Sequence, residues 1–333
     1  MSLYGSVARP LLFRLSPDSS HALAHAALRV AAPWRAASAL GGWRNDDPRL
    51  RVRFAGLDLP NPVGLAAGFD KNCELIDALD CFGFGFLTVG SIMPAPRHGN
   101  PFPRLVRYRE TQSLADAMGV PSHGRDYCVA RLRARRHTRT PLVANIGGFT
   151  AAEIAASFLA VEPYVDAVEI SLMCPNVQPG ERFDDLALLR EVLARIEARR
   201  KPAIVRVPND TAVVPDRLAE LIERCVAAGV AGLKIAGGKP VADPRLGVKQ
   251  GTLHGRAIFE RAIANVERAA KIARGRIPIK GNGGVSTGAA ALAMLRAGAA
   301  CVDIYSAFIY RGWSVARDIN RELLAARAGA ERA

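Results

Sequence analysis

Eight short apolar segments, each followed by a stretch with helical patterning, constrain the fold more than any other feature of the chain. Amphipathic stretches such as 184–199, 215–228 and 256–274 separate the later segments. Eight alternations of strand and helix over about 250 residues fit a closed (β/α)8 barrel of the TIM type better than an open doubly wound sheet. The eight predicted strands are 63–67, 86–90, 142–146, 167–171, 203–207, 232–236, 277–281 and 301–305.

Two segments lie outside the predicted barrel. Residues 49–61 predict a short hairpin that turns near Gly56 and closes the bottom of the barrel. Residues 1–42 predict a helical arm, in which Ser16, Pro17 and Asp18 supply a cap and a first-turn proline. Because the arm cannot bury its apolar face alone, it must dock on the barrel, a partner or a membrane surface. We therefore divide the chain into an arm, 1–42, and a barrel domain, 43–333.

The charge and the cysteines limit the partners and the compartment. The net charge of +14 invites a nucleic acid or an anionic membrane as partner. The one concentrated basic run, 131–139, lacks aromatic residues for base stacking, so we interpret it as a solvated helix end and expect no nucleic acid. An anionic-surface contact is the alternative. Six scattered cysteines without ligand spacing predict no metal site and a reducing cytoplasm.

The sequence shows no apolar run long enough to cross a bilayer and no secretory signal. We therefore expect a cytoplasmic protein, and the arm leaves open a peripheral position on the inner face of the cell membrane.

Candidate functional residues follow the predicted strands, where a parallel barrel carries its chemistry. Cys174 follows the fourth strand, and a thiol is a plausible proton acceptor if its surroundings stabilise the thiolate. The glycine-rich run 281–285 and the segment 303–307 follow the last two strands and predict a phosphate site. A ring of polar residues at the other strand ends could line the edge of a flat cofactor: Lys71, Ser91, Asn145, Ser171 and Arg206.

Short motifs that are specific as a set lie at these strand ends and in the loops beside them. They are GLAAGFDK at 64–71, GFG at 83–85, PRL at 103–105, NIG at 145–147, CPN at 174–176, GG at 283–284 and IYS at 304–306. Together they resemble the dihydroorotate dehydrogenases over nearly the whole chain. The N-terminal arm is similar to that of the quinone-using, membrane-associated branch.

This resemblance implies an FMN-dependent enzyme that removes a proton and a hydride from a dihydropyrimidine, the hydride going to flavin N5. It implies a small-molecule substrate, with quinone and a membrane surface as partners of residues 1–42. The direction of the reaction and the oligomeric state stay open.

The resemblance also assigns roles by position, with Cys174 as the catalytic base. The cofactor-binding residues it implies are Ala67, Gly68, Lys71, Ser91, Asn145, Ser171, Arg206, Ala236, Gly255, Gly283, Gly284, Tyr305 and Ser306. The substrate-binding residues it implies are Lys71, Pro121, Ser122, Met173, Asn176, Gly237 and Gly238.

Several positions depart from the family pattern. The quinone-using branch normally carries serine at the position of Cys174, whereas the soluble branch carries cysteine. Pro121, Ser171 and Gly237 stand where substrate-binding asparagines are expected, and Met173 replaces a serine. Each unsatisfied polar group costs about 1–3 kcal/mol, so we interpret the pocket as rebuilt for a different ring or a less polar substrate.

Charged residues interrupt strands that should be apolar. Lys234 and Lys280 lie inside predicted strands, and the two-residue period places Lys234 and Glu169 on inward faces. We predict a buried charged layer of these three residues with Arg206, which must be mutually paired because an isolated buried charge is very costly. Arg206 also stands where the family has a lysine near flavin N1, and it keeps the positive charge.

Two alternative functions stay open at this point. One is an RNA-modifying flavoenzyme of the dihydrouridine-synthase kind, which the positive charge favours. The other is a non-catalytic flavin-binding paralogue, with which the missing asparagines are compatible.

Overall fold

Eight parallel strands form the closed barrel that the alternating pattern predicts. The computed structural model describes residues 3–45, 47–172, 185–209, 212 and 214–330. Each strand pairs with the next one along the chain, and the last pairs with the first. The strands are β3 (Val63–Leu65), β4 (Leu87–Ile92), β7 (Leu142–Ile146), β8 (Ala167–Ser171), β9 (Ala203–Arg206), β10 (Gly232–Ala236), β13 (Ile279–Asn282) and β14 (Cys301–Ile304).

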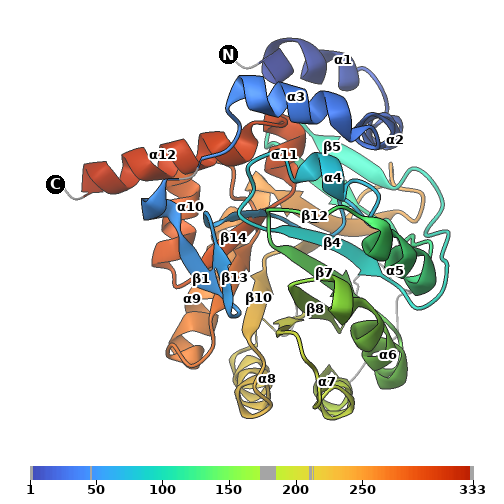
Figure 1. Cartoon of the computed structure of the whole chain (residues 1–333), viewed down its shortest axis with the longest axis vertical. Coiled ribbons are helices and arrows are strands. Elements are labelled where there is room, and N and C mark those ends of the chain that lie inside the picture. The colour runs from blue at the N-terminus through green and yellow to red at the C-terminus, as the bar shows by residue number, and fades with distance from the viewer. Residues whose placement is uncertain (1–2, 46, 173–184, 210–211, 213, 331–333) are drawn as a thin grey trace.

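Helices cover the outside of the barrel (Figure 1). Their inner faces carry apolar residues at helical spacing, as in α8, which buries Leu218, Leu221, Ile222 and Cys225. The predicted stretches 184–199, 215–228 and 256–274 correspond to α7, α8 and α9. The helices are α4 (Ile76–Leu79), α5 (Arg125–Ala134), α6 (Ala151–Val161), α7 (Asp185–Arg195), α8 (Pro215–Ala227), α9 (Phe259–Ala273), α10 (Gly288–Arg296), α11 (Ser306–Arg311) and α12 (Val315–Ala330).

An antiparallel hairpin closes the bottom of the barrel, as predicted. It joins β1 (Val52–Phe54) to β2 (Leu57–Leu59) through a turn that contains Gly56 at φ +77°. Phe54 and Leu59 are buried in one cluster with Val143, Ala167, Ile204 and Cys301 near the starts of the barrel strands. The apolar side of the hairpin therefore seals the end of the barrel that lies away from the strand termini used for chemistry.

The N-terminal arm packs on the barrel. It consists of a π-helical turn (Tyr4–Ala8), α1 (Arg9–Leu12), α2 (Pro17–Leu28) and α3 (Ala31–Gly41). The Ser16 side chain accepts a hydrogen bond from the Ser19 amide at the start of α2, and Trp34 contacts Phe82 and Trp313 edge-on or tilted. Within the described residues, no helix has both the length and the apolar character needed to span a membrane.

A four-stranded antiparallel sheet beside the barrel was not anticipated. Its order is β11-β12-β6-β5, and it joins two insertions that follow β4 and β10. Both insertions leave the carboxyl ends of barrel strands, so the sheet lies at the mouth of the barrel. Its strands are β5 (Leu105–Tyr108), β6 (Ser113–Asp116), β11 (Lys239–Ala242) and β12 (Gln250–Gly255).

Candidate active site

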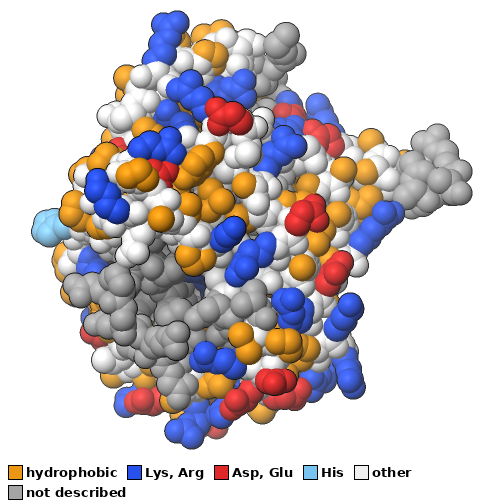
Figure 2. All heavy atoms as spheres, turned by 180° about the vertical axis from the view of Figure 1, so that it is seen from behind, with side chains coloured by type: hydrophobic (Ala, Val, Ile, Leu, Met, Phe, Trp, Pro, Cys, Tyr) orange, Lys and Arg blue, Asp and Glu red, His pale blue; other side chains and the backbone are white. Residues whose placement is uncertain are grey.

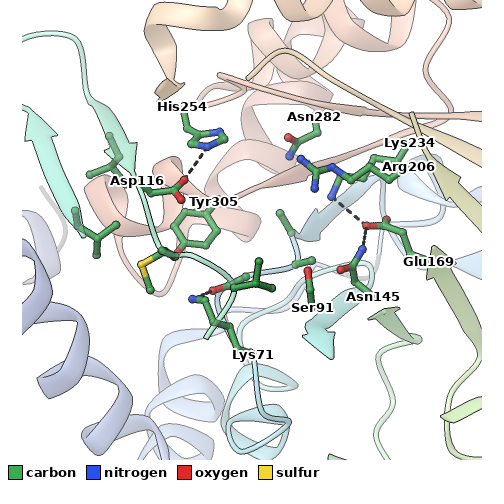
Figure 3. Close-up of a pocket in the computed structure, with 17 residues that line it drawn as sticks. Lys71, Ser91, Asp116, Asn145, Glu169, Arg206, Lys234, His254, Asn282 and Tyr305 are labelled. Atoms are coloured by element: carbon green, nitrogen blue, oxygen red, sulfur yellow. Dashed lines mark hydrogen bonds and ion pairs between the residues drawn. The ribbon is translucent and has the colours of Figure 1, made fainter. Parts of the chain in front are cut away.

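A cavity opens at the carboxyl ends of the barrel strands (Figure 3). Four of the five residues of the predicted polar ring line it, although they come from four different strands or the loops after them; the fifth, Ser171, does not line it. The cavity-lining residues among the predicted cofactor contacts are Ala67, Gly68, Lys71, Ser91, Asn145, Arg206 and Tyr305. Burial raises the pKa of Tyr305 well above its ordinary value of 10, so its phenol stays protonated.

Hydrogen bonds orient the polar side chains of this ring. The Lys71 ammonium donates to the carbonyl of Gly68. The Asn145 amide nitrogen donates to Glu169 Oε1 at 2.8 Å, whereas the Asn145 Oδ1 atom is buried with no hydrogen-bond partner among the described residues. A buried acceptor without a partner is costly, so this atom favours a ligand that donates a hydrogen bond into the cavity.

A second, glycine-lined pocket adjoins the first. His254, Asn282 and Tyr305 line both, and the predicted phosphate contacts Gly255, Gly283, Gly284 and Ser306 line the second pocket.

Gly284 shows why this second pocket requires glycine. It has φ +73°, and a Cβ there would lie 2.8 Å from Phe259 Cβ and 2.9 Å from the Gly255 carbonyl oxygen. A side chain at this position would displace Phe259 or the Gly255 backbone, so glycine is needed to keep this part of the pocket lining in place.

Three members of the predicted charged layer, Glu169, Lys234 and Lys280, are paired inside the barrel, and with Asp303 they form a closed ring of alternating charges. Lys234 Nζ lies 3.3 Å from Glu169 Oε1 and 3.0 Å from Asp303 Oδ2. Lys280 Nζ lies 2.6 Å from Glu169 Oε2 and 3.3 Å from Asp303 Oδ2. Each lysine thus contacts both carboxylates. The sequence-based prediction did not include Asp303, although an acidic residue in an otherwise apolar strand is a signal of the same kind as Lys234 and Lys280.

The side chains of Glu169, Asp303 and Lys280 are fully enclosed, and that of Lys234 is 5% exposed. Lys234 and Glu169 form part of the cavity lining. Burial alone would raise the pKa of Glu169, but Lys234 and Lys280 together lower it to about 2. Burial alone would lower the pKa of Lys280, but Glu169 and Asp303 raise it above its ordinary value. Glu169 and Lys280 are therefore ionised at neutral pH. Arg206 stands outside these four ion pairs and donates to Ser171 Oγ at 3.2 Å.

The sheet at the barrel mouth contributes a wall that sequence reasoning missed. Asp116 and His254 lie on neighbouring antiparallel strands, and His254 Nε2 is 2.8 Å from Asp116 Oδ2. The two side chains share a face because His254 lies two residues beyond Thr252, the partner of Asp116 in the register. Figure 3 shows this pair on the opposite side of the cavity from Arg206, Lys234 and Glu169. The remaining residues of this wall are apolar: Leu105, Leu114, Met118 and Val120.

Several predicted contacts lie outside the cavity lining. Pro121 and Ser122 do not line it, and the buried Ser122 hydroxyl instead accepts the amides of Met93 and Gly124. Ser122 therefore holds the loop rather than facing the cavity.

Three further predicted contacts, at the end of β10 and just beyond it, do not line the cavity either. The Ala236 carbonyl accepts from Asn265, and a Cβ on Gly237 would meet Ala262 at 2.6 Å, so both pack toward α9. Gly238 lies beside His254, whose Cε1 would be 3.3 Å from a Cβ placed there.

The segment that carries the predicted base follows β8. Cys174, Met173 and Asn176 lie outside the described residues. β8 ends at Ser171, which pairs in register with Arg206 on β9, so the chain leaves the barrel at the edge of the cavity. Across the described residues, no group of three or more histidine, cysteine or acidic side chains could hold a metal ion.

Comparison with known proteins identifies the family. A family profile described as dihydroorotate dehydrogenase matches residues 49–326. The chain belongs to the dihydroorotate dehydrogenase family. The prediction of an oxidoreductase of this family, which acts on a CH–CH bond, is thereby confirmed.

Similar proteins extend the match to the arm. The chain is 36% identical over 333 residues to a dihydroorotate dehydrogenase (quinone) of Roseiflexus castenholzii, covering 95% of this chain and 90% of that one. It is 37% identical over 343 residues to one of Methylococcus capsulatus, covering 97% and 99%. A crystal structure of the dihydroorotate dehydrogenase of Eimeria tenella in complex with ferulenol superposes with a TM-score of 0.81 at 27% identity, covering 95% and 93%.

Proposed function

We propose that this protein is an FMN-dependent oxidoreductase that removes a proton and a hydride from neighbouring carbons of dihydroorotate or, in our preferred reading, of a related ring or enone. The observation that carries this proposal is the pair of joined pockets at the barrel mouth, one lined by polar side chains and one by glycines. Their shape and chemistry suit a flat ring system linked to a phosphate.

The residues present fit FMN. Ala67, Gly68, Lys71, Ser91, Asn145 and Arg206 would hold the ring, and the unpartnered Asn145 Oδ1 would accept a hydrogen bond from it. Gly255, Gly283, Gly284, Tyr305 and Ser306 would hold the phosphate end. When bound, FMN accepts the hydride. Arg206 would supply positive charge for the reduced form.

Cys174 is the proposed general base. Cys174 follows Ser171 by three residues in the sequence, Ser171 pairs in register with Arg206, and a cationic neighbour would stabilise a thiolate. Lys71 is the proposed contact to the substrate. Asn176 is the proposed amide partner, and Met173 lies next to the base in sequence.

The described pocket favours a less polar ring than orotate. Ser171 is hydrogen-bonded to Arg206, Gly237 has no side chain to offer, and part of the wall is apolar. These features remove hydrogen-bonding partners that a polar ring would require.

A quinone is the proposed electron acceptor. An apolar cavity of about 430 Å³ lies between the arm and the barrel, bounded by Leu12, Phe13, His21, Phe69 and Phe308, among others. The Roseiflexus castenholzii and Methylococcus capsulatus relatives are named dihydroorotate dehydrogenase (quinone). Phe69 lines this cavity, and Lys71, only two residues later in the chain, lines the proposed flavin site. The apolar cavity therefore lies close to the proposed flavin site.

Large apolar side chains of the arm are exposed, notably Leu40 at 91% and Leu3 at 70%. They favour attachment of a cytoplasmic protein to the inner face of the membrane.

Figure 2 shows Lys and Arg side chains scattered over the face it presents rather than gathered in one patch, which gives no support to RNA modification.

The test is an absorbance spectrum of the purified protein, followed by anaerobic mixing with dihydroorotate and with related rings or enones. We expect bound FMN whose visible absorbance bleaches with a ring less polar than dihydroorotate. Rapid bleaching by dihydroorotate would contradict the altered-pocket interpretation. Bleaching by none of them would favour the non-catalytic alternative.

Replacing the proposed base separates catalysis from binding. Cys174→Ala should retain FMN and lose at least about 100-fold in the rate of bleaching, because a general base contributes this much or more. Cys81→Ala, which changes a thiol packed beside the arm, is the matched control and should bleach like the parent. An unchanged rate in Cys174→Ala would remove this thiol from the mechanism.

A further inference from the structure

The ring of Glu169, Lys234, Asp303 and Lys280 lies directly beneath the cavity, and one of its cations is open to it. Lys280 is fully enclosed, whereas Lys234 lines the cavity beside Arg206 (Figure 3). An ammonium has three N–H donors. One N–H of Lys234 is donated to Glu169 Oε1, and the ammonium also forms an ion pair with Asp303, so at least one N–H remains to face a ligand.

We infer that Lys234 is a flavin-tuning residue, whose third N–H donates to the flavin ring and whose effective charge is set by Glu169 and Asp303. This inference rests on the proposed flavin function. It goes beyond that function by giving a role to four buried charges that neither proton removal nor hydride transfer uses.

The charges of the ring explain why it acts on the flavin. The two lysines and two carboxylates cancel, so Arg206 is the cation of this cluster that has no ion pair among the described residues. A two-electron reduced flavin carries negative charge on its pyrimidine ring, and a fixed charge acts strongly on it where little water screens the interaction. Any change that unbalances the ring should therefore shift the flavin reduction potential, with a sign set by the residue removed.

Two single substitutions give opposite expectations. Glu169→Gln leaves an excess positive charge and should favour the reduced flavin, whereas Lys234→Met leaves an excess negative charge and should disfavour it. If the ring were only a packing device, both variants would lose stability while the potential stayed unchanged. The sign of the shift therefore distinguishes tuning from structural damage.

A paired substitution protects the test against misfolding. Glu169→Gln with Lys280→Met removes one charge of each sign and keeps the contact of Lys234 with Asp303. Its ring is again neutral, so its potential should lie close to that of the parent. Lys271→Met, on the exposed side of α9, is the control for loss of a lysine charge far from the cavity.

The experiment measures the flavin midpoint potential of each purified holoprotein against a reference dye, and the dissociation constant of sulfite, which adds to flavin as an anion. We expect Glu169→Gln to favour reduction at least tenfold, which is about 30 mV for two electrons, and Lys234→Met to disfavour it by a similar factor. Sulfite affinity should change in the same directions.

Shifts of equal sign in the two single variants, or shifts below threefold, would overturn the inference. A paired variant that deviates as far as Glu169→Gln would do so as well. Absence of flavin from the parent protein would instead defeat the proposed function, so the two failures are distinguishable.

Discussion

Replacing Lys280 with methionine should reveal how much the buried ring contributes to stability. The Lys280 ammonium is fully enclosed, lies 2.6 Å from Glu169 Oε2 and 3.3 Å from Asp303 Oδ2, and also sits 5.1 Å from the centroid of Phe86. Methionine nearly fills the space but removes the charge, which leaves two buried carboxylates to share Lys234. Breaking a buried pair by removing one partner costs about 3–5 kcal/mol in the free energy of unfolding.

The assay is urea unfolding at pH 7.5, followed by far-ultraviolet circular dichroism. Lys280→Met should lower the free energy of unfolding by about 3–5 kcal/mol, whereas the exposed Lys271→Met should change it by less than about 0.5 kcal/mol. Adding Glu169→Gln to Lys280→Met should recover part of the loss, because the ring regains equal numbers of charges. A loss below about 1 kcal/mol in Lys280→Met would refute the view that this lysine is needed to balance buried charge.

Three further predictions concern the arm and the two pockets. Burial, aided by the charge of Lys71, lowers the pKa of His25 from 6.5 to about 4, so the folded state favours the neutral imidazole. This pKa difference corresponds to about 3 kcal/mol in the free energy of unfolding, which should be complete above pH 6.5 and lost as the pH falls toward 4. Urea titrations at pH 7.5 and 4.5 check this, and a His25→Leu variant with the same loss on acidification would contradict it. Gly284→Ala places a Cβ against Phe259 and the Gly255 carbonyl, so FMN affinity should fall at least about tenfold in a fluorescence titration; unchanged affinity would count against the phosphate site. His254→Ala should raise the substrate KM about tenfold without altering the bound flavin spectrum, and an unaltered KM would exclude the pair with Asp116 from substrate binding.

Local patterns in the sequence were enough to predict the barrel, the hairpin and much of the cavity lining. The β-branched strands and helical spacing are read within about 15 residues, because side-chain direction follows the period of each element. Lys71, Ser91, Asn145 and Arg206 could be placed at one mouth for the same reason, since carboxyl ends of parallel strands in a barrel converge. Strand parity also indicated that Glu169 and Lys234 point inward.

Only the tertiary structure decided which of these groups meet. Asp303 joins the ring because β13 and β14 are neighbours and both lysines contact its carboxylate, a choice of partner that no local period contains. Asp116 and His254 are 138 residues apart in the chain, and they pair only because two insertions from different strand ends form one antiparallel sheet. Whether a side chain points inward is set by its own strand, whereas the pairing and balance of charges depend on the distances among side chains of several strands. The sequence by itself therefore determined the barrel and the edge at which its chemistry lies, and the packing of distant segments determined which buried charges balance and which remain to act on a ligand.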